Sequence, residues 1–278
     1  IEKYDQNHIF TATLQHAFSP RYNIAVNDSF VVGQEPDLLR VPEASVTEPE
    51  RISGDNFRNY GTIVFDARLT PVFSLQLNYA NGWFDYENQD GTVADPSSSA
   101  LLDRIENNIY VEGHWLLKPV TTGILGYSYG SVFYTGDEPI GVGLVSEDRN
   151  SRSHYGYVGV NHAFRPDLQG SLKGGVQYID FYNDPSEESD FSPYIVATLR
   201  YSSTPDSNWE LGFKQSRSAT DLVDQVGLTS DFVHDMDTSL VYATWHKRLA
   251  PRLFGNLIGT YQDSTYNGGS VDGESQQY

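Results

Sequence analysis

The chain has 278 residues, and its 18 Lys and Arg against 37 Asp and Glu give a net charge of −19, which argues against nucleic acid as a partner because phosphate binding needs basic surface. It contains no Cys, which excludes disulfides and thiolate metal sites. Hydrophobic residues make up 38% and aromatic residues 13%, yet no run of about 20 consecutive apolar residues could form a helical membrane span. This composition favours a wall one residue thick, with lipid outside and water inside.

Six prolines recur along the chain at intervals of 39 to 51 residues and predict tight turns. Most of them follow a large apolar residue two positions earlier, as in Phe18-Ser19-Pro20 and Leu69-Thr70-Pro71. The interval suits a hairpin of two long strands followed by one long loop. The predicted turns lie at Pro20, Pro71, Pro119, Pro166, Pro205 and Pro251.

Strands are predicted on both sides of each turn, because apolar and polar residues alternate there with a period of two. Several stretches alternate over about 9 to 11 residues, the length of a tilted membrane-spanning strand, whereas the strands of a soluble sandwich or propeller average about 5 to 6. Six hairpins give twelve strands, and nothing in the composition divides the chain. Residues 1–278 are therefore predicted to form one domain, an all-β antiparallel transmembrane meander β-barrel.

Long polar segments separate the hairpins, and they hold 26 of the 37 acidic residues but only 6 of the 18 basic ones. Long loops at one end and tight turns at the other are typical of outer-membrane barrels. The acidic surplus therefore gathers at the loop-side rim. Stretches such as 183–190 predict at most weak binding of divalent cations, since they lack the spaced ligands of a calcium loop. The segments are 34–56, 87–104, 135–152, 182–190, 215–237 and 263 onward.

Aromatic residues on the outward parity cluster at two levels, which predicts interfacial girdles in contact with outer-membrane lipid. Ordinary cross-strand packing of aromatic residues is the simpler alternative. Near the turns they are Phe18, Tyr22, Phe73, Trp115, Phe164, Trp209 and Trp245; toward the loops they are Phe10, Phe30, Trp83, Tyr129, Phe133 and Tyr178.

Polar residues recur on the inward parity five positions before each turn proline, which predicts a belt inside the wall. Such a belt could select ions, although lumen positions are polar in any barrel. Glycines predicted to face inward leave room in the lumen, namely Gly126, Gly130, Gly156, Gly175 and Gly212. The belt is Gln15, Asp66, His114, Asn161, Arg200 and His246, and the predicted pore-lining residues are Asp66, Arg68, Glu112, His114, Lys173, Arg200, Lys214 and His246.

Catalysis is not expected, because none of the seven His residues lies in a Gly-x-Ser-x-Gly or His-Glu-x-x-His context. No cofactor or metal site is predicted either. His16 and His162 each lie four residues before a turn proline, where an amphipathic ring at the membrane interface has a structural role.

The repeated apolar-x-Pro turns, the strand sequences 126–130 and 158–166, and the acidic, Tyr-rich composition together resemble bacterial outer-membrane β-barrel proteins of the β-barrel porin type. The resemblance extends over the whole chain in style, and no single motif is diagnostic. It implies an outer-membrane location and two classes of cargo, small solutes or glycan. It transfers no catalytic residue.

Three functions follow as hypotheses. The first is a porin-like channel for small hydrophilic solutes. The second is a structural scaffold that binds other envelope proteins or a second copy of itself, and the third is an exopolysaccharide export barrel. The direction of the strands also predicts that flanking strands are missing, because both ends of the chain fall on the loop side. The complete barrel is therefore expected to have fourteen or more strands.

Overall fold

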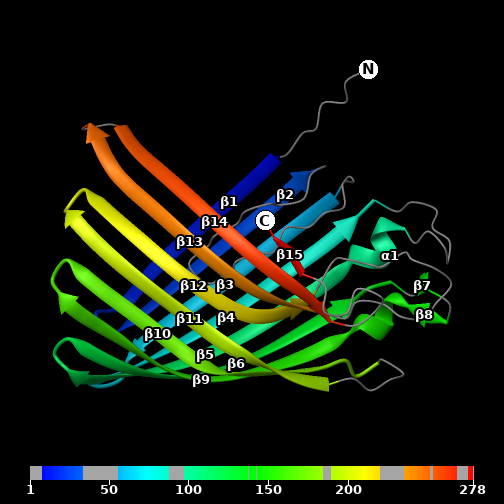
Figure 1. Cartoon of the computed structure of the whole chain (residues 1–278), viewed down its shortest axis with the longest axis horizontal. Coiled ribbons are helices and arrows are strands. Elements are labelled where there is room, and N and C mark those ends of the chain that lie inside the picture. The colour runs from blue at the N-terminus through cyan, green and yellow to red at the C-terminus, as the bar shows by residue number, and fades with distance from the viewer. Residues whose placement is uncertain are drawn as a thin grey trace.

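The computed structural model describes residues 8–33, 56–87, 97–136, 138–141, 143–183, 189–219, 235–250, 253–267 and 275–277. Twelve long antiparallel strands, each paired with its neighbours in chain order, form a strongly curved sheet (Figure 1). The predicted all-β antiparallel meander is confirmed. The long strands are β1 (His8–Ser19), β2 (Tyr22–Gly33), β3 (Asn56–Arg68), β4 (Phe73–Tyr86), β5 (Arg104–Lys118), β6 (Thr121–Tyr134), β9 (Ser151–Arg165), β10 (Leu168–Asp180), β11 (Ser189–Thr204), β12 (Ser207–Ala219), β13 (Asp235–Ala250) and β14 (Leu253–Asn267).

All six predicted hairpins are present. The turn between β3 and β4 shows why such short connections form: the Thr70 hydroxyl accepts a hydrogen bond from the Phe73 amide at 2.9 Å, and the Thr70 amide donates to the Phe73 carbonyl at 3.0 Å. Pro71 therefore falls outside the ladder, where its missing N–H costs nothing. Pro251 lies outside the described residues, but Ala250 and Leu253 pair on either side of it.

Two of the segments predicted to be long loops, 87–104 and 135–152, contain short regular elements. They hold α1 (Ser98–Leu102), β7 (Pro139–Gly141), β8 (Leu144–Val145) and the 3₁₀ helix η1 (Ser146–Arg149). Elements this short leave no period in the sequence. The local signal for α1 is its N-cap, since the Ser97 hydroxyl accepts a hydrogen bond from the Ala100 amide at 3.1 Å. We call α1, β7, β8 and η1 together the inner cap.

The two edges of the sheet are β1 and, at the loop end, β15 (Ser275–Gln277), which pairs with residues 263–265 of β14. Within the described residues no ladder joins β1 to β14. A closed twelve-stranded barrel is thus not observed there, and the expectation of fourteen or more strands stays a prediction. No helix in the described part of the chain is long and apolar enough to cross a membrane.

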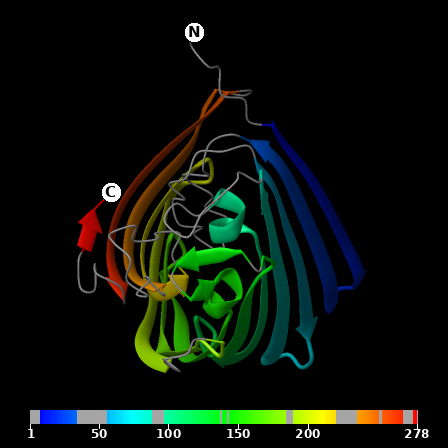
Figure 2. The same cartoon turned by 90° about the vertical axis from the view of Figure 1, so that its right-hand side faces the viewer.

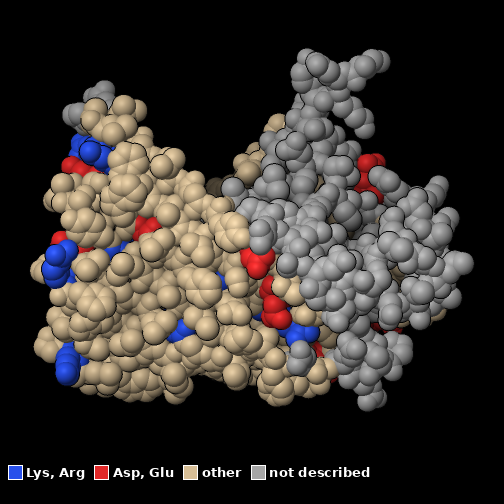
Figure 3. Space-filling model, viewed as in Figure 1, with Lys and Arg blue, Asp and Glu red and all other residues tan. Residues whose placement is uncertain are grey.

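The exterior of the wall carries an aromatic girdle near the turns, as predicted. The rings of Phe73 and Trp115 lie 4.6 Å apart, and those of Trp209 and Trp245 lie 5.6 Å apart. Just beyond them, basic side chains gather at the turn end of the face in Figure 3, while the surface over the strands is mostly uncharged. The exposed apolar residues above this girdle include Leu77, Leu125, Val158, Leu172, Val176, Leu199, Leu211 and Val241.

A second girdle lies toward the loops. Strand register places Tyr79, Tyr129, His154, Tyr178 and Phe191 in one lateral row, and the rings of Tyr178 and Phe191 lie 4.9 Å apart. On β9 the two girdles are separated by the stretch from Phe164 to His154, roughly 25 Å at about 3.3 Å per residue and a 40° tilt. That height matches the apolar band of about 25 Å on outer-membrane barrels. The next outward row is polar and contains Asp28, Asn81, Asn107, Ser131, Arg152 and Asp180.

Candidate functional site in the lumen

Inward-facing glycines let tyrosine rings lie flat on the inner wall. Gly126 of β6 pairs with Tyr157 of β9, and a Cβ at Gly126 would stand 2.1 Å from that ring. Gly212 of β12 pairs with Tyr242 of β13 in the same way, again at 2.1 Å. A Cβ at either position would displace the neighbouring ring, so each glycine leaves room for one tyrosine to lie where it does.

Each of these tyrosines donates its hydroxyl hydrogen to a glutamate. The Tyr157 hydroxyl lies 2.7 Å from Glu112 Oε1, and the Tyr242 hydroxyl lies 3.0 Å from Glu210 Oε1. The same arrangement of glycine, tyrosine and carboxylate thus occurs twice around the lumen. In both places a ring that covers the wall also holds a charged group in position.

Three side chains contact the Glu112 carboxylate. It forms an ion pair with Lys173 Nζ, lies 3.0 Å from His114 Nε2 and accepts from Tyr157. Lys173 stands on β10 and Glu112 on β5, so the pair reaches across the inner faces of β6 and β9. The Lys173 ammonium also lies 5.5 Å from the centroid of the Tyr157 ring.

A second ion pair joins adjacent strands. Arg200 Nη2 lies 2.6 Å from Glu210 Oε2, and its Nε lies 2.9 Å from the same oxygen. The Arg200 side chain is half exposed. In both ion pairs, opposite charges are therefore neutralised beside the inner face of the wall.

These residues border a cavity of about 780 Å³. Of the eight predicted pore-lining residues, Glu112, His114, Lys173, Arg200 and Lys214 line it, whereas Asp66, Arg68 and His246 do not. Parity along a strand indicates that a residue faces inward, but not which arc of the wall encloses the cavity. Of the predicted belt, His114, Asn161 and Arg200 line the cavity, and its role in selectivity stays a prediction.

The predicted residues outside the cavity make other contacts. Asp66 Oδ1 accepts a hydrogen bond at 2.8 Å from Gln76, which itself lines the cavity. His246 Nδ1 lies 2.5 Å from Asn256 Oδ1 on the neighbouring strand. One glycine was misplaced in the prediction: Gly156 faces outward, because it lies two residues from Val158, which is 63% exposed on the exterior.

Four tyrosines of the lumen were missed by sequence reasoning: Tyr110, Tyr157, Tyr194 and Tyr242 all line the cavity. The rings of Tyr157 and Tyr194 lie 5.2 Å apart. An inward glycine directly opposite an inward tyrosine would have indicated these rings. That pairing can be recognised in the sequence only when the register between neighbouring strands is known.

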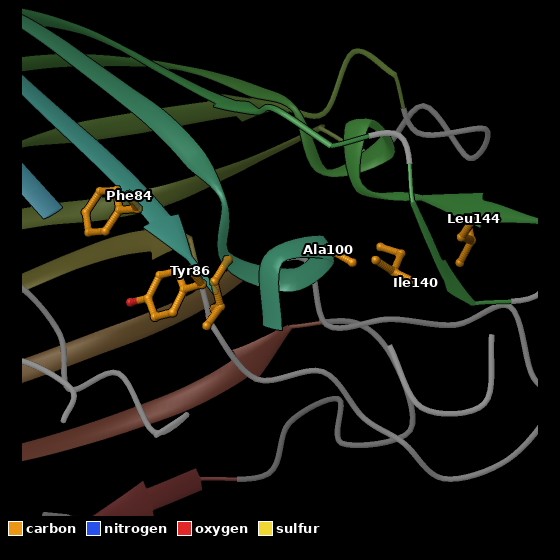
Figure 4. Close-up of a cluster of buried hydrophobic side chains, with 6 residues drawn as sticks. Phe84, Tyr86, Ala100, Ile140 and Leu144 are labelled. Atoms are coloured by element: carbon orange, nitrogen blue, oxygen red, sulfur yellow. The ribbon is translucent and has the colours of Figure 1, made fainter. Parts of the chain in front are cut away.

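The inner cap lies within the outline of the ring of strands, at its loop end (Figure 2). Its apolar contacts with β4 are shown in Figure 4 and comprise Phe84, Tyr86, Ala100, Leu102, Ile140 and Leu144. The Ser146 hydroxyl is fully buried and donates to the Ala100 carbonyl at 2.6 Å, which ties η1 to α1. The cap is thus a small packed unit that narrows the loop-side mouth.

Asp103, at the end of α1, makes the cap sensitive to pH. Burial raises the pKa of Asp103 from its ordinary 3.8 to about 7, assisted by the charges of Asp85 and Glu138 and opposed by the hydrogen bond from the Tyr86 amide and by Arg104. The folded cap binds more protons than the unfolded segment between about pH 4 and 7. The stabilisation that Asp103 gives the folded cap is therefore present in full below about pH 4, and it is lost as the pH rises through about 7.

We expect amide hydrogen exchange at Tyr86 and Leu102, corrected for the intrinsic rate, to show less protection at pH 8 than at pH 5. Asp103→Asn is the matched control, because its amide oxygen can still accept from the Tyr86 amide without gaining a charge. The variant should show the same protection at both pH values. A pH dependence that persists in Asp103→Asn would contradict this assignment.

The acidic loops fall largely outside the described residues, and so does most of the stretch 183–190 predicted to bind divalent cations weakly. Within the described part of the chain, no three His, Asp or Glu side chains come together as metal ligands. Weak cation binding at the loop rim therefore stays a prediction.

No protein-family model matches the chain, and no curated protein matches its sequence. Solved structures with similar topology include the ferric-catecholate import receptor Fiu of E. coli K12 in a closed form, with a TM-score of 0.43 and 10% identity over 99% of this chain and 54% of that chain. The alcaligin outer membrane receptor FauA of Bordetella pertussis has a TM-score of 0.41 and 10% identity over 94% of this chain and 44% of that chain. The chain thus spans about half the length of each.

Proposed function

We propose that this chain forms the wall of a channel for small hydrophilic solutes in the bacterial outer membrane. The observation that carries the proposal is the cavity of about 780 Å³, lined by charged and tyrosine side chains, inside a wall whose exterior is apolar between two aromatic girdles. Such a wall is suited to lipid contact outside and water inside. Its partner along the exterior is membrane lipid.

Two features of the lumen indicate which solutes the channel would admit. The charges of the lumen are paired, Glu112 with Lys173 and Glu210 with Arg200, which favours weak rather than strong discrimination between anions and cations. The inner cap narrows the loop-side mouth, which favours a limit on solute size. Both features suit uncharged or singly charged hydrophilic molecules.

Purified protein in a planar bilayer should give stepwise increases in conductance, with little preference between potassium and chloride in a salt gradient. In the companion assay, liposomes carrying the protein should swell in a pentose and stay unswollen in a large oligosaccharide. Heat-denatured protein from the same preparation is the control. Folded protein that is silent in both assays would contradict the channel and favour the structural scaffold instead.

A further inference from the structure

The backbone pairing between β11 and β12 ends early at the loop side of this seam. Pairing between these strands stops at Ile195 and Gln215, although β11 extends to Ser189 and β12 to Ala219. Over the same stretch, β11 stays paired with β10 and β12 with β13. At their loop-side ends the other described seams between long strands stay paired to within two residues of the strand ends.

The end of β12 leaves the wall and rests on its inner face. Gln177 of β10 donates to the Arg217 carbonyl at 2.7 Å and accepts from the Arg217 amide at 3.0 Å, and the Tyr155 hydroxyl lies 3.3 Å from the same carbonyl. Gln177 is fully buried. Arg217 shares the outward parity of Trp209 yet is only 7% exposed, so this face of β12 is covered at the loop-side end of the strand. We call these contacts of Gln177 and Tyr155 with Arg217 the latch.

Pro193 explains why the strands separate. It pairs with Val176 of β10, but it lies where β11 has lost its pairing with β12 and it brings no N–H to that seam; proline on such a strand edge opposes pairing. The seam therefore remains closed through side chains rather than through a backbone ladder. Opening the latch breaks only side-chain contacts with Arg217 and leaves each strand paired with its other neighbour.

The seam begins at the level of the loop-side girdle. Ile195 stands nine residues above the turn at Thr204, roughly 20 to 25 Å at about 3.3 Å per residue and a 40° tilt. Outside, Phe191 is 69% exposed beside Tyr178. The seam thus meets the membrane where lipid headgroups and acyl chains join.

Inside, the seam meets the cavity. Tyr194, the first residue of β11 beyond its pairing with β12, lines the cavity and packs edge-on against Tyr155 of the latch, with the ring centroids 5.5 Å apart. Ser192 lies two residues from Tyr194 on β11 and therefore on the same, inward face. Its buried hydroxyl has no hydrogen-bond partner among the described residues. The inner rim therefore offers uncharged hydrogen-bonding groups and aromatic faces, and the outer rim offers apolar surface.

From this geometry we infer that the seam is a lateral port between the lumen cavity and the outer leaflet, and that its cargo is an amphiphile with an uncharged polar head and an apolar tail. The head would pass along the tyrosines of the cavity and the tail would leave beside Phe191 into lipid. The latch holds the port shut in this structure. The inference rests on the proposed channel, because the port opens into the same cavity.

The test uses two probes with one headgroup, in liposomes carrying the full chain: maltose, followed by swelling, and a fluorescent dodecyl maltoside, followed by its extraction from the inner leaflet with albumin. Gln177→Ala should raise transfer of the maltoside about tenfold, since two buried hydrogen bonds of the latch are lost. Maltose passage should not change.

Pro193→Ala should act in the opposite direction and lower maltoside transfer to the protein-free rate, because the restored N–H allows the seam to pair. Gln262→Ala is the control: Gln262 is another buried loop-side glutamine, but its amide bonds to Ser264 on its own strand. If maltose passes but Gln177→Ala does not change the transfer of the maltoside, the lateral port is overturned and the channel is not. Absence of maltose passage in the unmodified protein counts against the channel itself.

Discussion

Replacing Glu112 with glutamine should destabilise the barrel by about 2 to 3 kcal/mol, since it leaves the Lys173 ammonium in a partly buried place without its counter-charge. The upper end of the usual range for a broken buried pair is not expected, because the Lys173 side chain is 23% exposed and gains some solvation. Urea unfolding from lipid vesicles, followed by tryptophan fluorescence, measures the change. The same variant should shift the reversal potential toward anions.

Glu210→Gln is the matched control for this prediction. Its partner Arg200 is 51% exposed, so the loss should stay under about 1 kcal/mol although the chemical change is identical. The double variant Glu112→Leu with Lys173→Met should recover most of the lost stability, because both charges leave together. Equal losses for Glu112→Gln and Glu210→Gln would show that the burial of Glu112 has no energetic role.

The strand framework could be predicted from sequence because each hairpin carries its own landmark. Pro71, for example, marks a turn whose flanking strands alternate and pair without a register shift, and the observed bounds agree with this alternation. The aromatic girdle near the turns could be predicted from the same alternation. Trp209 and Trp245 both have the outward parity, and their rings are in contact. A local period of two is sufficient for such features because it decides which face of the sheet each side chain takes, while the turns decide the direction of each strand.

The lumen could be predicted only in part, because its contacts depend on register across several strands. Glu112 and Lys173 are 61 residues apart and were predicted to face inward, but their pairing follows from the alignment of four consecutive strands. The seam at Pro193 was also missed. A proline inside an alternating stretch is visible in the sequence, yet the unpairing becomes apparent only when the partner strand is placed.

The inner cap gives the second large effect. Leu102→Ala removes a fully buried side chain from the cluster with Phe84, Tyr86, Ile140 and Leu144, and such a change costs about 2 to 5 kcal/mol in a packed core. That exceeds what a unit of a few short elements can lose, so the cap should leave the mouth while the long strands remain paired. Single-channel conductance should rise about twofold or more, and liposomes should admit larger sugars.

Leu77→Ala provides the comparison, because it makes the same chemical change on the exterior of β4, where Leu77 is 38% exposed. Conductance and the size limit should be unchanged in that variant. Hydrogen exchange separates the two possible causes of a larger pore: loss of protection confined to residues 97–103 and 143–150 means that the cap has opened, whereas loss throughout β4 and β5 means that the wall itself has failed. Unchanged conductance with an exchanging cap would mean that the cap does not restrict the channel.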